Sequence, residues 1–414
     1  MAKSENTHTI HSHEDIDLEN EFGAHNYKPI PVVISRGEGV HVWDTDGKVY
    51  YDFLSAYSAL NQGHRHPRLL EVARGQLEKL TLTSRAFYND KLGLAEQFLA
   101  ETFGYDKTLM MNSGAEAVET ALKLARRWGY DMKGIPDNKA VIIAAAHNFH
   151  GRTLGTISFS TDKSSRGGFG PFLPGVEIVN YNDTAGLEKA LQSPNICAFL
   201  VEPIQGEAGV IVPDGGYLTK VRELCTKYNV LMVADEIQTG LGRTGKMLCC
   251  DYEDVHPDVL ILGKALSGGF LPVSAVLCND DIMLNIKPGE HGSTFGGNPM
   301  AAVLCVEAIK IIVEEKLSEN AYELGFYFRE RMNAINSPVI KEVRGKGLFN
   351  AIQFNFPEES GKAYQLCIAL KDNGLLSKDT HGNTIRFAPP LIITKEQLEE
   401  CCDLIEKTIL AFSY

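Results

Sequence analysis

The sequence has few of the features that mark membrane or nucleic-acid-binding proteins. No run of nonpolar residues approaches the ~20 residues that a membrane helix needs. Lys and Arg number 40 against 53 Asp and Glu, which gives a net charge of −13, and no basic patch or basic tail is present. Nucleic acids and anionic membranes are therefore not expected as partners.

Two further absences concern the cysteines and the N-terminus. The nine cysteines are scattered without C-x-x-C spacing, which indicates reduced thiols, mostly in the core, and no disulfide framework. The first 20 residues contain no Arg, one Lys and five acidic residues, the opposite of a mitochondrial transit peptide. We expect residues 1–20 to form a disordered polar tail, and we expect a cytoplasmic protein, mitochondrial only if a transit peptide is missing from the sequence.

Two kinds of site are also not expected. His64 and His66 lack further ligands at metal spacing, and the histidines near the N-terminus lie in the polar tail, so no metal site is predicted. Residues 240–246, GLGRTGK, fit the first part of a P-loop, but Met247 stands where Ser or Thr is required and no strand directly precedes the loop. Both departures from the motif argue against a P-loop nucleoside triphosphatase.

What is present is a chain of 414 residues, 44% hydrophobic and 22% charged, which suits a globular protein with two domains. Short apolar runs alternate with helical patterns over residues 105–278, which predicts an α/β fold with a mostly parallel sheet covered by helices on both faces. A hairpin should turn at Asp46 and Gly47. The helices expected from periodicity span residues 67–80, 91–102, a long stretch from about 115, 299–315, 318–335, 361–373 and 395–412.

Lys264 and Asp235 are the residues around which this pattern is organised. Each ends an unbroken apolar run, 259–262 and 230–234, with the composition of a strand buried on both faces. Ligands bind at the carboxyl ends of strands in an open α/β sheet, so both side chains should reach one crevice. A desolvated lysine can form a Schiff base and an aspartate can pair with a protonated pyridine nitrogen, the two groups that pyridoxal phosphate most needs. Taken singly, Lys264 could cap a strand and reach solvent, and Asp235 could cap a helix or bind magnesium.

A third part of the predicted site is the turn Ser113-Gly114-Ala115, between a short strand and a long helix. Small residues at a helix start leave backbone N–H groups and the positive end of the helix dipole open to an anion. Such junctions are common, so the signal is weak alone. Beside Lys264 and Asp235 it predicts a phosphate site.

These segments carry a resemblance to a known family. The stretches VLMVADEIQTGLGRTG and PDVLILGKALSGG resemble the signature of the class III aminotransferases, which have the fold type I pyridoxal phosphate architecture. The likeness runs from about Phe22 to the C-terminus, and it is strongest to the members that use ornithine in the segments GAHNYKPIPVV, FLSAYSALNQGHRHP, LTSRAFYN, VEPIQGEAGVIVP, IKPGEHGSTFGGNP and THGNTIRFAPPL. The resemblance implies pyridoxal 5'-phosphate as cofactor. It also implies a large domain with a mostly parallel seven-stranded sheet over residues 59–298, a smaller α/β domain over 299–414, and an N-terminal segment, 21–58, that packs with the small domain.

The resemblance also implies the roles of individual side chains. Lys264 would form the Schiff base and carry the proton, and Asp235 would hold the ring nitrogen. The remaining contacts to the cofactor would come from Ser113, Gly114, Ala115, Phe149, Gln238, Ser293 and Thr294, the last two reaching the cofactor of a neighbouring subunit in a homodimer. The contacts to substrate would come from Tyr27, Tyr57, Arg152, Glu207 and Arg386.

The reaction implied is transfer of the δ-amino group of L-ornithine to 2-oxoglutarate. Arg152 would hold the substrate carboxylate and Tyr27 its α-amine, while Glu207 would mask Arg386 until 2-oxoglutarate enters. The alternatives within the family are N-acetylornithine and 4-aminobutyrate as amine donors, and decarboxylases or aminomutases of the same fold suit two arginines less well. A nucleotide-binding or structural α/β protein would use the same strands without the chemistry of Lys264.

Overall fold

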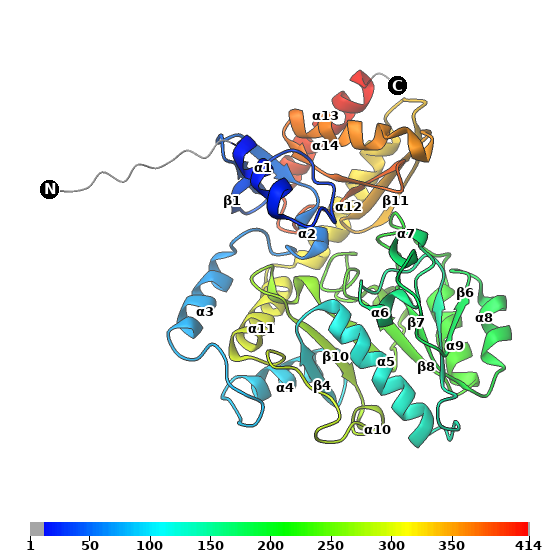
Figure 1. Cartoon of the computed structure of the whole chain (residues 1–414). Coiled ribbons are helices and arrows are strands. Elements are labelled where there is room, and N and C mark those ends of the chain that lie inside the picture. The colour runs from blue at the N-terminus through cyan, green and yellow to red at the C-terminus, as the bar shows by residue number, and fades with distance from the viewer. Residues whose placement is uncertain (1–11, 413–414) are drawn as a thin grey trace.

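The computed structural model describes residues 12–412, whose strands form three sheets (Figure 1). The largest sheet has seven strands, and only β10 runs antiparallel to its neighbours. In sheet order the strands are β4 (Lys107–Met111), β10 (Ser274–Cys278), β9 (Val259–Leu262), β8 (Leu231–Asp235), β7 (Ile196–Val201), β5 (Val141–Ala145) and β6 (Val176–Val179). The predicted α/β fold with a mostly parallel seven-stranded sheet is confirmed.

The central strands are uniformly apolar because helices cover both faces of the large sheet. Every residue of β7 is buried, and neighbours along β5 face opposite sides: Ile142 packs in the cluster around α5, and Ile143 packs in the cluster around α8 and α9. Burying both faces removes the alternation of polar and apolar residues that a half-exposed strand would show. The long apolar runs in the sequence are thus a direct consequence of this layering.

Each stretch that periodicity predicts as helical contains a helix, within a few residues at each end, whereas α8 and α9 were not predicted. α5 has the most pronounced amphipathic pattern and begins with a capping box between Ser113 and Glu116. The described helices are α1 (Ser12–Phe22), α2 (Ser55–Ser58), α3 (Pro67–Leu77), α4 (Leu92–Phe103), α5 (Gly114–Asp131), α6 (Leu154–Ile157), α7 (Lys163–Arg166), α8 (Thr184–Leu191), α9 (Tyr217–Lys227), α10 (Asp280–Met283), α11 (Pro299–Glu314), α12 (Leu317–Asn333), α13 (Lys362–Asp372) and α14 (Lys395–Ala411). Short 3-10 helices cover Cys249–Glu253, Lys264–Ser267 and Glu358–Ser360.

Two smaller sheets make up the upper part of the molecule in Figure 1, where the blue N-terminal elements lie beside the orange and red C-terminal ones. One sheet joins both ends of the chain, because β13 pairs in parallel with β3. Its strands are β1 (Ile34–Glu38), β2 (His41–Asp44), β3 (Val49–Asp52) and β13 (Leu375–Leu376), and β2 and β3 form the hairpin predicted at residues 46 and 47. The other sheet contains β11 (Ile340–Lys346), β12 (Phe349–Phe354), β15 (Thr384–Phe387) and β14 (Lys378–Thr380).

The helix α11 lies with the large part of the molecule, whereas the sequence-based division begins the small domain at residue 299. Arg68 at the start of α3 forms ion pairs with Glu307 and Glu314 of α11, at 2.6 and 2.7 Å. The side-chain amide of Gln62 donates a 3.0 Å hydrogen bond to the carbonyl of Ala308 in the same helix. These contacts attach α11 to the elements that precede the large sheet, and we propose that the small domain begins after this helix.

The N-terminal prediction of disorder is wrong over part of its range. Residues 12–20 belong to α1, while residues 1–11 lie outside the described part of the chain. Glu14 and Asp15 in the first turn of α1 complement the positive end of the helix dipole, and the Gly23 N–H bonds the carbonyl of Glu19 at its end. Polar composition alone suggested a tail, but acidic residues at a helix start also stabilise a surface helix.

Residues 12–412 contain no helix that is both long and apolar enough to cross a membrane. The same part of the chain contains no cluster of His, Cys, Asp or Glu side chains able to hold a metal ion. All nine cysteines are buried free thiols, as predicted.

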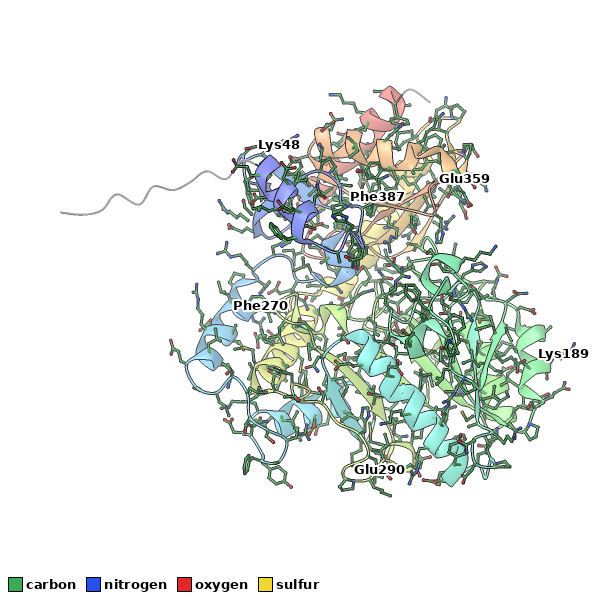
Figure 2. The ribbon with its side chains drawn as sticks, in the orientation of Figure 1. Lys48, Lys189, Phe270, Glu290, Glu359 and Phe387 are labelled. Carbon is green, nitrogen blue, oxygen red and sulfur yellow. The ribbon has the colours of Figure 1, made fainter. Side chains whose placement is uncertain are left out.

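Arg243 joins the parts of the molecule at their centre. Its guanidinium is fully buried and donates hydrogen bonds to the carbonyls of Leu348 and Pro389, at 2.9 and 2.6 Å, and to Oδ1 of Asn61 at 2.6 Å. Close by, Phe387, labelled in Figure 2, packs against Phe53 and Phe328 with ring centroids 6.4 and 5.6 Å apart. Residues 240–246, which resemble part of a P-loop, therefore have a structural role, because they carry the arginine that connects these regions.

The structure predicts a large loss of stability for Arg243→Met. The substitution keeps an unbranched side chain but leaves three buried oxygen acceptors without their donors, which should lower the free energy of unfolding by roughly 3–5 kcal/mol. Urea unfolding followed by circular dichroism measures this. The exposed Arg74→Met in α3 is the control, and equal stability of the two variants would contradict the assigned role of Arg243.

Candidate active site

Asp235 and Lys264 lie at adjacent strand ends. Asp235 is the last residue of β8 and is in register with Ile261 of β9, the parallel neighbour. Lys264 follows β9 after Gly263 and has a φ of +45°, which is unusual for a residue other than glycine. Such left-handed conformations are costly and concentrate at functional sites, where the surrounding structure maintains them.

A cavity of about 190 Å³ lies at this edge of the sheet. Six of the residues predicted to contact a cofactor line it: Gly114, Ala115, Phe149, Asp235, Gln238 and Lys264. They come from the start of α5, the loop after β5, the end of β8 and the segment after β9. The fold thus brings together residues that are up to 150 positions apart (264 − 114) in the sequence.

Ser113 does not contribute its N–H group to this cavity, contrary to the sequence-based expectation. Its N–H donates to Oε2 of Glu116 at 2.7 Å, and its hydroxyl accepts from the N–H of Glu116 at 3.2 Å. This capping box uses the donor that the isolated turn appeared to leave open. Gly114 and Ala115, the first two residues of α5, line the cavity at the positive end of the helix.

Asp235 is held by two hydrogen bonds. Its Oδ2 lies 2.7 Å from Nδ1 of His150, and its Oδ1 accepts from the N–H of Ile237 at 3.1 Å. Burial alone would lower the pKa of His150, but the hydrogen bond and the negative charge of Asp235 outweigh burial and raise it. The carboxylate thus stabilises the charged form of the imidazole, whose Nε2 is buried without a partner among the described residues.

Glu202 is a second carboxyl group on the wall of this cavity. Burial raises its pKa to about 8, although its Oε1 accepts a 2.9 Å hydrogen bond from the N–H of Phe149. Lys264 borders the cavity as well, and burial among protein atoms lowers the pKa of its ammonium. A lower pKa increases the fraction of neutral, nucleophilic amine near pH 7.

A larger cavity of about 810 Å³ adjoins the first and shares Phe149 and Lys264 with it. All five residues predicted to contact substrate line this second cavity: Tyr27, Tyr57, Arg152, Glu207 and Arg386. Arg152 lies with its guanidinium 5.1 Å from the ring centre of Phe149, at the side where the two cavities meet. The predicted substrate residues therefore surround the approach to Lys264.

Glu207 and Arg386 form an ion pair inside this cavity. The carboxylate oxygen lies 2.5 Å from the guanidinium of Arg386, whose side chain is only 4% exposed. Burial alone would raise the pKa of Glu207, but the positive charges of Arg386 and Lys264 outweigh burial and lower it. Glu207 is thus ionised at neutral pH and neutralises Arg386.

Tyr57 owes its position to an unusual backbone. The four residues of α2, Ser55–Ser58, all have positive φ, from +48° to +72°, so this segment is a left-handed turn made without glycine. Oδ1 of Asp52 holds its start by accepting from the N–H groups of Leu54 and Ser55. The turn places the ring of Tyr57 5.2 Å from the guanidinium of Arg386.

Ser293 and Thr294 line neither cavity within the described chain. The hydroxyl of Ser293 accepts a 2.8 Å hydrogen bond from the side chain of Asn112 and a 3.0 Å bond from the N–H of Gly296. The loop is therefore fixed against the strand that leads into α5. The single chain leaves the predicted contact of these two residues with a neighbouring subunit untested.

Sequence reasoning missed His150 and did not assign Glu202 a role. His150 stands between Phe149 and Arg152, directly after a buried strand, so its position was a usable signal. Its pairing with Asp235 spans 85 residues and could not be found from spacing. Sequence reasoning also missed Thr380, which lines the larger cavity from β14.

Comparisons with known proteins agree with this geometry. The family model described as aminotransferase class-III matches residues 22–409. An ornithine aminotransferase, mitochondrial, from Drosophila melanogaster is 58% identical over 393 residues, which cover 95% of this chain and 90% of that protein.

Solved structures are similar over almost the whole chain. The ornithine aminotransferase from Toxoplasma gondii has a TM-score of 0.95 and 48% identity over 97% of this chain and 94% of its own, and it is described with partial occupancy of PLP at its active site. An acetylornithine aminotransferase from Elizabethkingia anophelis has a TM-score of 0.90 and 56% identity over 97% of this chain and 99% of its own. The family match, the identity and the coverage together show that the chain belongs to the class-III aminotransferase family.

Proposed function

We propose that the chain transfers the δ-amino group of L-ornithine to 2-oxoglutarate, with pyridoxal 5'-phosphate as cofactor. The products are glutamate 5-semialdehyde, which cyclises to pyrroline-5-carboxylate, and L-glutamate. The observation that carries the proposal is the pair of Glu207 and Arg386 beside Lys264, a buried cation masked by a carboxylate. The identity of 58% to a relative named for ornithine supports the same substrate.

The residues around the smaller cavity fit the proposed cofactor. Two helix N-terminal residues at one side suit a phosphate, the carboxylate of Asp235 suits a protonated ring nitrogen, and the amine of Lys264 suits an aldehyde. The wall tolerates no larger side chain at its glycines, since a Cβ on Gly151 would lie 2.9 Å from Cβ of Ala115. The donor set and the close walls therefore support a flat, phosphorylated pyridine as ligand.

When bound, pyridoxal phosphate supplies an electron sink and carries the amino group between the two substrates. Lys264 would hold its aldehyde and, as a free amine, would move a proton at the carbon that bears the amino group. Asp235, oriented by His150 and the N–H of Ile237, would pair with the ring nitrogen. Phe149 would pack on the ring, and Gln238 would donate to its phenolic oxygen.

The larger cavity selects which amine of a diamino acid reaches Lys264. Arg152 holds the α-carboxylate through two parallel hydrogen bonds, and the hydroxyl of Tyr27 accepts a hydrogen bond from the α-amine. The δ-amine is then directed towards Lys264. Tyr57 lines the pocket. With Glu207 on Arg386, no free cation stands beside Lys264 to attract an α-carboxylate instead.

The second substrate requires the opposite charge pattern. When 2-oxoglutarate enters, the carboxylate of Glu207 moves off Arg386, which then binds the α-carboxylate. Arg152 holds the distal carboxylate of the same molecule. One ion pair thus lets a single site accept a terminal amine in one half-reaction and a 2-oxo acid in the other.

We propose a homodimer in which Ser293 and Thr294 reach the cofactor of the partner. The loop carrying these residues also exposes Phe295, and the neighbouring segment exposes Phe87 and Tyr88. The two segments meet where Gly297 lies against Arg85. Exposed aromatic residues on adjacent segments are typical of a surface that another subunit covers. A cytoplasmic location also stays a proposal, and the Drosophila relative is named as mitochondrial.

The amine donor is tested by mixing the holoenzyme with L-ornithine, N-acetylornithine or 4-aminobutyrate in the absence of any oxo acid. We expect L-ornithine to remove the visible absorption of the bound cofactor fastest, because the acetylated α-amine of N-acetylornithine is uncharged and bulkier beside Tyr27, and 4-aminobutyrate has no α-amine. N-acetylornithine is the strongest competitor, given the Elizabethkingia structure. Faster reaction with either other amine would replace ornithine as the proposed donor.

Lys264→Ala should abolish turnover while the fold remains. Deleting both the covalent anchor and the proton carrier should lower kcat by several orders of magnitude, roughly 10⁴-fold or more. Steady-state turnover and borohydride reduction followed by mass spectrometry measure the two losses. The exposed Lys189→Ala, marked at the edge of Figure 2, is the control, and normal turnover by the Lys264 variant would refute the mechanism.

Glu207→Ala should raise the reaction of the holoenzyme with the α-amine of L-glutamate. The unmasked Arg386 would attract the α-carboxylate, and we expect at least about a tenfold rise, the ~1.4 kcal/mol of one decade in rate. Stopped-flow absorption measures the glutamate half-reaction. Glu188→Ala, which removes a surface partner of Lys227, is the control. An unchanged glutamate rate in the Glu207 variant would argue against masking.

A further inference from the structure

The loop that carries Glu207 is closed on itself. The N–H of Gln205 donates to the carbonyl of Ile211 at 3.1 Å, and the N–H of Ile211 donates back to Gln205 at 2.9 Å. Inside this pair, the carbonyl of Gly206 accepts from Gly209 and Val210, at 3.0 and 3.1 Å. Residues 205–211 therefore form a compact turn, here called the Glu207 loop.

Hydrogen bonds from the sheet that contains β11, β12, β15 and β14, here called the small sheet, and from its turns hold the main chain of this loop. The carbonyl of Glu207 accepts from the hydroxyl of Thr380 at 3.0 Å and from Nε2 of His381 at 3.1 Å. The carbonyl of Gly209 accepts from Nε of Arg344 at 2.8 Å. Both lone pairs of the Glu207 carbonyl thus accept hydrogen bonds, from two adjacent residues at the end of β14.

The same hairpin holds the side chain of Glu207. Thr380 ends β14, His381 begins the turn, and Arg386 lies on β15, which pairs with β14. One hairpin therefore binds the carbonyl of Glu207 through two donors and its carboxylate through a third.

Packing also limits movement of the loop towards the site. A side chain on Gly206 would collide with Oε1 of Gln238 and with the ring of Phe349, so the backbone there is in close contact with both. Gly209 has a φ of +104°, a conformation that side chains rarely adopt. Moving the loop as a unit would disturb this packing and break the bonds from Thr380, His381 and Arg344. Rotating the side chain of Glu207 would break its pair with Arg386 and its hydrogen bond with Gln238, but would leave these main-chain bonds intact.

We propose that Thr380 and His381 are positioning residues that fix the main chain of Glu207, so that its carboxylate alone leaves Arg386 and returns in every cycle. This inference rests on the proposed function, in which that ion pair separates the two half-reactions. If the carbonyl were released, the loop would have further conformations in which Glu207 misses Arg386. The exposed cation would then admit α-amino acids in the wrong half-reaction.

The test compares two half-reactions of each holoenzyme. The rate of cofactor bleaching by L-ornithine divided by that by L-glutamate defines a selectivity ratio, which a general loss of activity would not change. Thr380→Val and His381→Phe each remove one donor, and each should lower the ratio about fivefold, the size expected for one lost neutral hydrogen bond.

The design includes a matched control and a double variant. Thr384 pairs in register with Thr380 across the hairpin, and its hydroxyl bonds Asn383 instead of Glu207, so Thr384→Val should leave the ratio unchanged. Glu207→Ala should lower the ratio by more than either donor variant. Adding Thr380→Val to Glu207→Ala should change it no further, because a positioning residue acts only through the group it positions.

The outcomes distinguish failure of the positioning role from failure of the masking of Arg386 by Glu207. If Glu207→Ala lowers the ratio but neither donor variant does, the positioning role is wrong and the proposed function stands. If Thr380→Val lowers the ratio equally in the Glu207→Ala background, it acts by another route and the inference is also overturned. If Glu207→Ala itself leaves the ratio unchanged, masking of Arg386 and the inference built on it both fail.

Discussion

The meeting of two parallel strand ends is the constraint on which the rest of the site depends. Because β8 and β9 are neighbours in register, Asp235 and Lys264 reach the same edge of the sheet without any long loop. Both strands are buried on both faces, and burial at their ends lowers the pKa of Lys264, while Asp235 is paired with His150. Chemistry at this edge therefore follows from the layering of the fold.

Selectivity is a separate property supplied by other parts of the chain. The smaller cavity is formed by the start of α5, the end of β8 and the segments that follow β5, β7, β8 and β9, whereas the larger cavity also takes Tyr27, Tyr57 and Arg386 from the two smaller sheets and their connections. Arg243 ties these regions together at a buried centre. In this arrangement, the joint between the parts keeps the proposed substrate contacts in register with the proposed cofactor contacts.

Much of this could be predicted from the sequence, because apolar runs, helical periodicity and motif residues are local signals. The ends of β8 and β9 were recognisable from composition, and the resemblance named every residue of the larger cavity that the proposed mechanism uses. What failed depends on contacts that spacing does not encode. Ser113 lost its free N–H to a capping box with Glu116, and the bond from His150 to Asp235 joins two elements. Residues 12–20 formed a helix because an acidic first turn suits a helix start as well as a tail.

The central claim is that the site takes the terminal amine of a diamino acid and excludes the α-amine. The most direct measurement follows nitrogen from L-ornithine labelled with ¹⁵N at either position, with 2-oxoglutarate as acceptor and mass spectrometry of the glutamate formed. The account predicts labelled glutamate from δ-¹⁵N ornithine and unlabelled glutamate from α-¹⁵N ornithine. Label arriving from the α position would contradict the masking of Arg386 by Glu207 and the substrate orientation derived from it.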